Sequence, residues 1–536
     1  MGVTYQLLSY YFGDKRRNNY LCIMQVSRTK RTLQNSKVSL ILFVIQIFVG
    51  FYSRKIFLDY LGDEIIGLNT TLGNILSFLN LAELGIGIAM ATSLYKPIHD
   101  KDENAIIDIM SVQRILYRRI AILLCGLSIP ILIAIPFIFP STECSIIYIY
   151  IAYFVFLSGS IFSYLWNYRE VLIEADQKSF KLTPWIHCVR YIKIITQVIL
   201  LIFTPLGIWG WIGAELAGNI ATVFVINSVI KKEYPWLHKS KEETSILLQK
   251  HKIILTKTKQ LFIHKIGGFV LYQTSPIVIY AFVSLEMVTH YGNYMMLIGY
   301  CLSLTSVIFG GMGASIGNLV ADNNKQHTME VFWELFTSRI WIGGIACYAI
   351  YICIGPFISF WIGEKYLLSE STLLLLVLYL FIQISRSVIE SFKDAFQLFG
   401  DVWAPIIEAC INLGGSILFG YLWGLNGVLI GVNLSLILII VLWKPFYIFH
   451  YGIKSSVITY YYQYTLHLVV LVLVGLFVNY IIQQFDYLEK NYIAIAIICL
   501  IGLLMYSIIT YSILYLCTKG MRMFTSRIKN IIKNKI

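Results

Sequence analysis

The sequence predicts an all-α integral membrane protein with about fourteen transmembrane helices. Long apolar stretches fill most of the 536 residues, and Lys and Arg fall mainly in every second connection between them. Hydrophobic residues make up 58% of the chain and charged residues only 13%, whereas an ordinary soluble domain carries about 25% charged residues. A span needs roughly 20 apolar residues to cross about 30 Å of hydrocarbon. Continuous apolar runs, rather than alternation, favour helices, which satisfy their own backbone in lipid.

The connections also predict the orientation of the spans. The predicted spans are 37–59, 66–95, 115–139, 146–173, 185–205, 207–230, 263–285, 289–319, 338–361, 371–393, 402–423, 426–449, 465–484 and 491–517. Cations gather in the even-numbered connections and at both termini. Because positive loops stay in the cytoplasm, both ends are predicted to be cytoplasmic. The net charge of +13 therefore reflects topology, and the basic stretch 250–259 is interpreted as a solvated face near anionic head groups rather than a nucleic-acid site.

Two sequence repeats predict an internal duplication. GIWGWIGAELAGNI at 207–220 is similar to GLNGVLIGVNLSLI at 424–437, and LGDEIIGLN at 61–69 is similar to VSLEMVTHY at 283–291. The members of both repeats are separated by nearly the same length of chain. An even number of spans between the repeats gives two halves of the same orientation, which is an architecture of transporters.

The domain boundaries follow from these repeats and from the basic stretches. We expect a basic cytoplasmic tail at 1–36, a six-helix bundle at 37–230, a basic cytoplasmic linker at 231–262, a second six-helix bundle at 263–450, two additional helices at 451–517 and a basic cytoplasmic tail at 518–536. Residues 1–23 lack the pattern of a signal peptide, and Met24 is a candidate start. The ten cysteines are scattered without CxxC spacing, which predicts neither a disulfide framework nor a metal site.

Several charged residues lie within the spans, where they are costly and usually face a bundle interior. The cations are Arg54, Arg190, Lys193, Lys265 and Arg386. Arg190 and Lys193 are three residues apart and share a helix face. Arg54 could instead snorkel to the outer head groups, and Lys265 could be the last residue of its loop. A cavity lined by these cations would suit an anionic ligand, phosphate in particular.

Four carboxylates are candidates for ion coupling or for charge balance, and the sequence does not choose between these roles. They are Glu83, Glu215, Glu390 and Glu408. Arg386 and Glu390 are helical neighbours, with Lys393 and Asp394 one turn further on, so an internal ladder of ion pairs explains them as well as a function does. No residue is assigned a catalytic role.

One stretch carries a family pattern. It contains Arg54, Glu64, GLN at 67–69, LAELGIG at 81–87 and LYKP at 94–97. In this it resembles the Wzx-type polysaccharide flippases of the multidrug/oligosaccharidyl-lipid/polysaccharide (MOP) exporter superfamily, whose fold is similar to that of the MATE transporters. Supporting matches lie at 173–180, 313–321, 403–431 and 443–453. One position departs from the pattern, since Ser275 stands where relatives usually have an Asp.

The resemblance implies transport without covalent chemistry. An undecaprenyl-pyrophosphate-linked oligosaccharide would be flipped across the cytoplasmic membrane by alternating access through a cationic central cavity. Its product would serve O-antigen, capsule or exopolysaccharide synthesis. No cofactor is expected beyond coupling to a proton or sodium gradient, and the absence of an Asp at Ser275 puts coupling at that position in doubt. Membrane lipids, a polysaccharide polymerase and a chain-length regulator are the expected partners.

Two other functions stay open. A membrane glycosyltransferase or polysaccharide polymerase could use Asp63 and Glu64 for metal binding or as a base, although the predicted outer loops leave little room for an acceptor site. A MATE-like drug or cation antiporter would need a cavity dominated by carboxylates rather than by cations.

Overall fold

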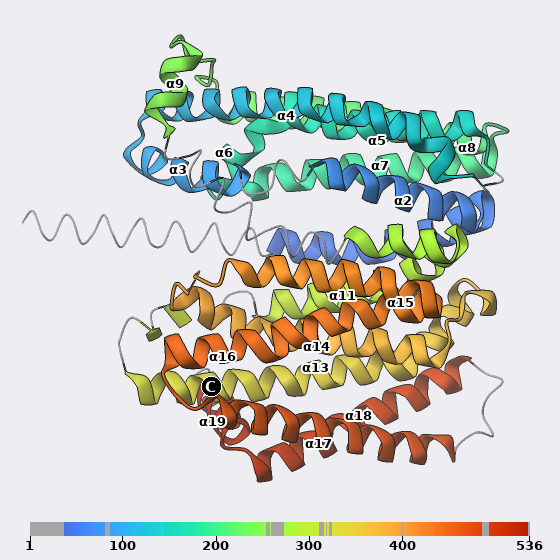
Figure 1. Cartoon of the computed structure of the whole chain (residues 1–536), viewed down its shortest axis with the longest axis vertical. Coiled ribbons are helices and arrows are strands. Elements are labelled where there is room, and N and C mark those ends of the chain that lie inside the picture. Colours follow the sequence, from blue (N-terminus) through green and yellow to red (C-terminus); the bar gives the residue numbers. More distant parts are fainter. Residues whose placement is uncertain are drawn as a thin grey trace, which may run out of the picture. The chain divides into compact units, whose positions relative to one another are not determined.

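The computed structural model describes most of the predicted membrane-embedded chain. The described residues are 37–80, 86–140, 142, 144–252, 254, 258, 273–309, 316, 317, 319, 320, 324–398, 400–484 and 492–533. The predicted tail 1–36, Glu83 and Lys265 lie outside the described residues. Within this part, the regular elements are all helical (Figure 1).

Ten helices of the described residues are long and apolar enough to cross a membrane. They are Lys37–Leu61, α4 (Glu103–Ile138), α5 (Ile146–Leu165), α7 (Ser179–Phe203), α8 (Gly207–Glu233), α13 (Lys325–Trp361), α14 (Glu370–Ala395), the continuous stretch Trp403–Ile453, α17 (Val457–Gln483) and α18 (Tyr492–Cys517). Shorter or less apolar helices are α2 (Asp63–Leu79), α3 (Ile86–Asp100), α6 (Glu170–Ala175), α9 (Thr244–Lys250), α11 (Leu285–Phe309) and α19 (Lys519–Lys533). The predicted class, an all-α multi-pass membrane protein, is confirmed. The count of fourteen spans is not fixed by these helices.

The chain divides into two compact units. Unit 1 comprises Met1–Gly62 and Leu76–Phe262, and unit 2 comprises Asp63–Ile75 and Ile263–Ile536. Helix α2 therefore starts in unit 2 and ends in unit 1. In unit 1 α7 packs along α8, and α4 and α8 pack against α5. In unit 2 α14 packs against α13, and α18 and α19 also pack on α13.

Helix starts recur at the spacing of the sequence repeats. α2 and α11 begin at positions 63 and 285, and α4 and α13 at positions 103 and 325, so the two pairs have the same separation along the chain. Asp102 and Asn324, at that separation too, cap α4 and α13, and each side chain accepts a hydrogen bond of 3.0 Å from a backbone N–H three residues on. An N-cap side chain satisfies a donor that the first turn leaves unpaired. Corresponding positions thus start long helices in both units.

The stretch Trp403–Ile453 contains a hairpin of two helical arms. α15 (Trp403–Leu436) loses helical geometry at Trp423 and at Gly424, whose φ of 56° and ψ of −132° suit a residue without Cβ. The arms then run side by side, since Ser416 Oγ donates to the Val428 carbonyl at 3.2 Å. Gly207, which occupies the position equivalent to Gly424 in the sequence repeat, opens α8 with a φ of 51°. Equivalent turns thus join α7 to α8 in unit 1 and the two arms in unit 2.

Gly431 is expected to be intolerant of a side chain because the two arms approach at this point. A Cβ on Gly431 would clash with the backbone nitrogen of Ser416. We expect Gly431→Ala to destabilise the protein by about 1–3 kcal/mol, the usual cost of overpacking, as a lower thermal midpoint in detergent. Gly414→Ala is the matched control, since a Cβ there meets nothing within 4 Å. Equal midpoints for the two variants would contradict this close approach.

The C-terminal part of unit 2 continues from the hairpin. The second arm passes into a π-helix, η4 (Ile437–Trp443), then α16 (Lys444–Ile448) and a second π-helix, η5 (Phe449–Ile453). π-helical turns are rare and often lie at functional sites. α17 and α18 pack on one another and against α13, and the rings of Tyr348 and Tyr506 stack at 4.2 Å. The two predicted additional helices are therefore integrated into unit 2.

Candidate functional site

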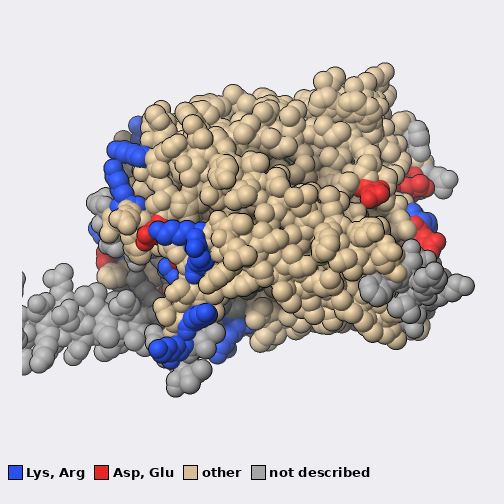
Figure 2. Space-filling view, turned by 90° about the horizontal axis from the view of Figure 1, so that it is seen from below, with Lys and Arg blue, Asp and Glu red and all other residues tan. Residues whose placement is uncertain are grey.

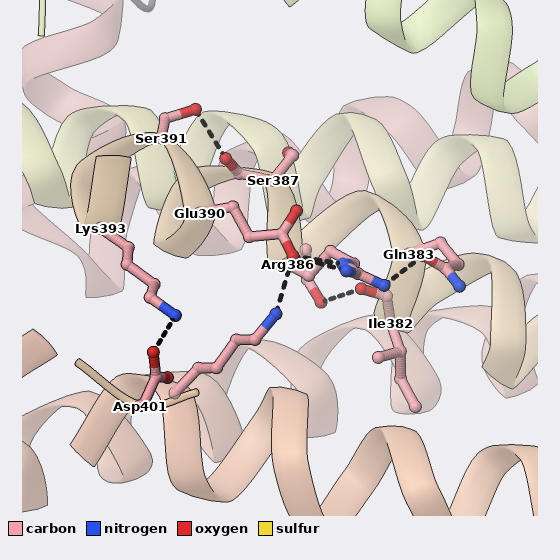
Figure 3. Close-up of polar contacts among 10 residues, drawn as sticks. Ile382, Gln383, Arg386, Ser387, Glu390, Ser391, Lys393 and Asp401 are labelled. Carbon is pink, nitrogen blue, oxygen red and sulfur yellow. Dashed lines mark hydrogen bonds and ion pairs between the residues drawn. The ribbon is translucent and has the colours of Figure 1, made fainter. Parts of the chain in front are cut away.

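The main charged site of unit 2 is built on one face of α14. Gln383, Arg386 and Glu390 are spaced by three and four residues and so lie along the same side of the helix. Arg386 Nη2 lies 2.5 Å and Nε 3.0 Å from Glu390 Oε1, while Nη1 donates to Gln383 Oε1 at 3.1 Å. Figure 3 shows the guanidinium held between these two side chains. The predicted pairing of Arg386 with Glu390 is present.

Lys444 completes this cluster and was not among the residues that the sequence singled out. It begins α16, directly after the π-helical turn η4, and its Nζ lies 2.9 Å from the same Glu390 Oε1. One carboxylate oxygen therefore serves two cations. The only sequence signal was the WKPF motif at 443–446, which belongs to the family resemblance but does not reveal the partner.

Lys393 and Asp401 form a second, more deeply buried pair. Lys393 lies near the end of α14 and Asp401 in the connection to α15, and their charged groups form an ion pair (Figure 3). The side chain of Asp401 is 0% exposed. The sequence places Lys393 or Asp394 next to Glu390 along the helix, and in the structure Lys393 pairs with Asp401 from the following connection.

Glu408 is a buried carboxylate next to these cations. It lies in the first arm of α15, is 3% exposed, and is within electrostatic range of Lys444 and Arg386. Within the described residues its Oε1 accepts no hydrogen bond. Asn412 and Ser416, four and eight residues on, are buried on the same face. A polar stripe thus runs from the charged cluster into the interior of unit 2.

The charges of this cluster balance. Three cations, Arg386, Lys393 and Lys444, lie near three carboxylates, Glu390, Asp401 and Glu408. Of these carboxylates Glu390 has a partly exposed side chain, at 36%, and it is the one that Arg386 and Lys444 share.

Unit 1 contains a smaller site between α7 and α8. Lys193 Nζ pairs with Glu215 Oε1 at 2.8 Å, and Gln197 Nε2 donates to Glu215 Oε2 at 3.1 Å. The stem of Lys193 crosses α8 at Gly218, where a Cβ would lie 2.5 Å from Lys193 Cδ. Glu215 thus balances a charge in unit 1, as Glu390 does in unit 2.

Two other predicted cations, Arg190 and Arg54, lie among the described residues of unit 1. Arg190 is exposed although it precedes Lys193 by three residues on α7, and Arg54 is half-buried in the helix Lys37–Leu61. The structure brings together Lys193 with Glu215 and Arg386 with Glu390. Convergence of all the predicted cations on one cavity stays a prediction.

Comparison with known proteins identifies the fold. No family model and no curated protein matches the sequence. Among solved structures, the chain is similar to "Lipid II flippase MurJ, inward closed conformation", with a TM-score of 0.59 and 18% identity over 89% of this chain and 99% of that chain. It is also similar to an inward-facing "multidrug resistance MATE family transporter of the MOP superfamily", with a TM-score of 0.57 and 16% identity over 78% of this chain and 100% of that chain.

A third similar structure is the Vibrio cholerae MATE transporter VcmN D35N mutant, with a TM-score of 0.53 and 14% identity over 80% of this chain and 99% of that chain. Identities this low show the fold alone. The chain therefore has the fold that is common to this lipid flippase and to these multidrug transporters. The MATE-like fold expected from the sequence is confirmed.

Proposed function

We propose that this protein flips an undecaprenyl-pyrophosphate-linked oligosaccharide across the cytoplasmic membrane for the synthesis of a surface polysaccharide. The observation that carries the proposal is the sharing of Glu390 by Arg386 and Lys444 inside the helical part of unit 2. Charged groups at such depth are costly and usually mark a transport pathway. The narrower substrate class comes from the resemblance of residues 54–97 to Wzx-type flippases.

The chemistry of this cluster fits a diphosphate. Arg offers a planar fork that matches phosphate oxygens, and Lys offers a compact point charge. A diphosphate could take the place of Glu390 between the two cations, and neither cation would then lose a counter-ion. Such an exchange keeps both cations paired, and leaving one of them unpaired would cost several kcal/mol. The released Glu390 carboxylate, 36% of whose side chain is exposed, would be solvated instead. In the absence of substrate, Glu390 would thus keep the charged groups of Arg386 and Lys444 in position.

The extent of the structural similarity supports a lipid substrate. The flippase structure covers 89% of this chain, whereas the MATE structure, matched over all of its own length, covers 78%. About a fifth of this chain therefore has no counterpart in that drug transporter. The second candidate function, a drug or cation antiporter, would also need carboxylates in excess, but the cluster on α14 is balanced.

An enzymatic role for Asp63 has less support. In unit 2 the Asp63 carboxylate pairs with Lys365 Nζ at 3.1 Å and accepts a hydrogen bond from the Tyr366 hydroxyl. A metal or a catalytic proton would have to displace these partners. Among the described residues no group of three His, Cys, Asp or Glu side chains could hold a metal ion.

Charge at the surface supports the proposed orientation. On the face that carries the C-terminal helices, exposed Lys and Arg gather mainly at one end, and between the ends no described charged residue is visible (Figure 2). The region between the two ends would face the hydrocarbon, and the end rich in Lys and Arg would lie in the cytoplasm.

Glu408 is the proposed site for a coupling proton, because it is a buried carboxylate beside the cations of the cluster. A polymerase and a chain-length regulator are proposed as partners.

Purified protein in vesicles provides the test. A fluorescent oligosaccharide on a polyprenyl diphosphate should become accessible to a membrane-impermeant quencher faster in vesicles with the protein than in empty vesicles. The same lipid with a neutral hydroxyl end should not be flipped, because it offers the cations nothing to bind. Equal flipping of both lipids would contradict the proposal. Efflux of a cationic dye would favour the antiporter, and incorporation of labelled sugar into polymer would favour an enzyme.

A further inference from the structure

α19 is a basic helix that follows the last membrane-spanning helix almost without a break. α18 ends at Cys517 and α19 begins at Lys519. The residue between them, Thr518, is buried and caps both helices, since its hydroxyl donates to the Leu514 carbonyl at 2.6 Å and accepts from the Met521 N–H at 3.4 Å. The helix therefore starts directly after the last candidate membrane span of the described residues.

One side of α19 is fixed to the long helix α13. Met521 is fully buried, and Gly520 lies so close to α13 that a Cβ there would clash with the Trp333 carbonyl oxygen. Arg527 Nε lies 2.8 Å from the buried carboxylate of Glu334. A second ion pair joins Lys519 to Glu330 at 3.3 Å. These contacts set which side of α19 faces away from the protein.

The outward side of α19 carries cations that no acid balances. α19 contains five Lys and Arg residues and no Asp or Glu. Arg522, Lys529 and Lys533 are exposed, and none of them has an ion-pair partner among the described residues. Arg522 and Lys529 are seven residues apart and Lys533 follows four residues later, so the three cations share one face of the helix. A row of solvated cations on a helix that follows a span is typical of the membrane interface.

We propose that the outward side of α19 binds anionic phospholipid head groups. The partner is a lipid rather than a protein or a nucleic acid, because the helix starts at the end of a span and is held in place by its other side. Arg522, Lys529 and Lys533 pair with lipid phosphates, while the pair between Arg527 and Glu334 holds the other side of α19 on α13.

Unit 1 contains a corresponding contact, in which a lysine from another segment pairs with an acid near the start of the long helix α4. Lys250, the last residue of α9, pairs with Asp108 of α4 at 2.5 Å. Asp108 and Glu330 occupy the same position relative to the starts of α4 and α13. In both units an acid near the start of the long helix thus holds a lysine from the segment beyond the bundle. α9 is only seven residues long, whereas α19 extends far enough to present a second, lipid-facing side.

Native mass spectrometry of the purified full-length protein in detergent tests the proposal. The probes are phosphatidylglycerol, which is anionic, and phosphatidylcholine, which is not. We expect the wild type to retain phosphatidylglycerol preferentially, and the triple variant R522Q/K529Q/K533Q to bind it at least fivefold more weakly. The matched control K231Q/K239Q/K241Q removes three exposed cations from unit 1 and should stay within twofold of wild type.

Defined results overturn the proposal. Equal retention of the two lipids by wild type, unchanged affinity in the α19 variant, or equal losses in the two triple variants would each contradict a specific lipid site. Full lipid binding by the α19 variant together with loss of a co-purifying protein would assign the surface to a protein partner instead. None of these measurements depends on transport.

Discussion

Arg386→Ala is expected to reduce transport strongly while the protein still inserts and folds. The substitution removes the fork that lies 2.5 Å from Glu390 Oε1, and with it the bidentate contact proposed for the diphosphate. Hydrogen bonds between charged groups contribute about 1.5–3 kcal/mol, which corresponds to a loss of roughly 10- to 150-fold in the flipping rate. Vesicle flipping measures this loss directly. In cells, surface polysaccharide should disappear and lipid-linked units should accumulate on the inner leaflet.

The triple variant R386Q/E390Q/K444Q separates substrate binding from a purely structural set of ion pairs. It removes all three charges, so that neither Glu390 nor Lys444 is left without its partner. If the ion pairs only stabilised the helices, the triple variant would regain transport. We expect it to fold at least as well as Arg386→Ala and to remain impaired in transport. Lys519→Ala, which breaks an exposed pair with Glu330 in the same unit, is the control and should transport normally.

Asp401→Asn is expected to cause the largest loss of stability. Asp401 is fully buried and balances Lys393, of which 11% of the side chain is exposed. Removing one partner of a buried pair leaves an uncompensated charge and costs about 3–5 kcal/mol. The variant should unfold at a clearly lower temperature in detergent, and much of it should aggregate on extraction.

A charge-free replacement of both residues tests the cause of this loss. The double variant K393M/D401N should regain most of the lost stability, because neither position then carries a buried charge. Glu242→Gln is the control, since it removes one exposed partner of Lys250 and should change stability by less than about 1 kcal/mol. If Asp401→Asn and Glu242→Gln had the same midpoint, the buried pair would not stabilise the fold as argued here.

The fold class was predictable from the sequence because apolar stretches of bilayer length allow few structures other than helices. Contacts within one helix were predictable too. Arg386 and Glu390 are four residues apart on α14, and they pair as this spacing indicates. The number of spans is harder to predict, because the two arms of α15 are joined only by the kink at Trp423 and Gly424.

Contacts between helices could not be predicted in the same way. Lys193 and Glu215 were identified singly, but their pairing depends on the register that the turn before Gly207 imposes on α7 and α8. Lys444 was missed because it reaches Glu390 only after the chain has turned back through the hairpin and passed a π-helix. Hydropathy gives the length of a helix but not its rotation about its own axis.

The turns at Gly207 and Gly424 have a consequence for how antibodies and proteases can recognise the chain at each of these two positions. α7 ends at Phe203 and α8 starts at Gly207, and the two arms of α15 are separated only by Trp423 and Gly424. An antibody, a phage or a protease would find very few non-helical residues to bind at either turn. Epitope tags at these two places would have to supply their own spacer.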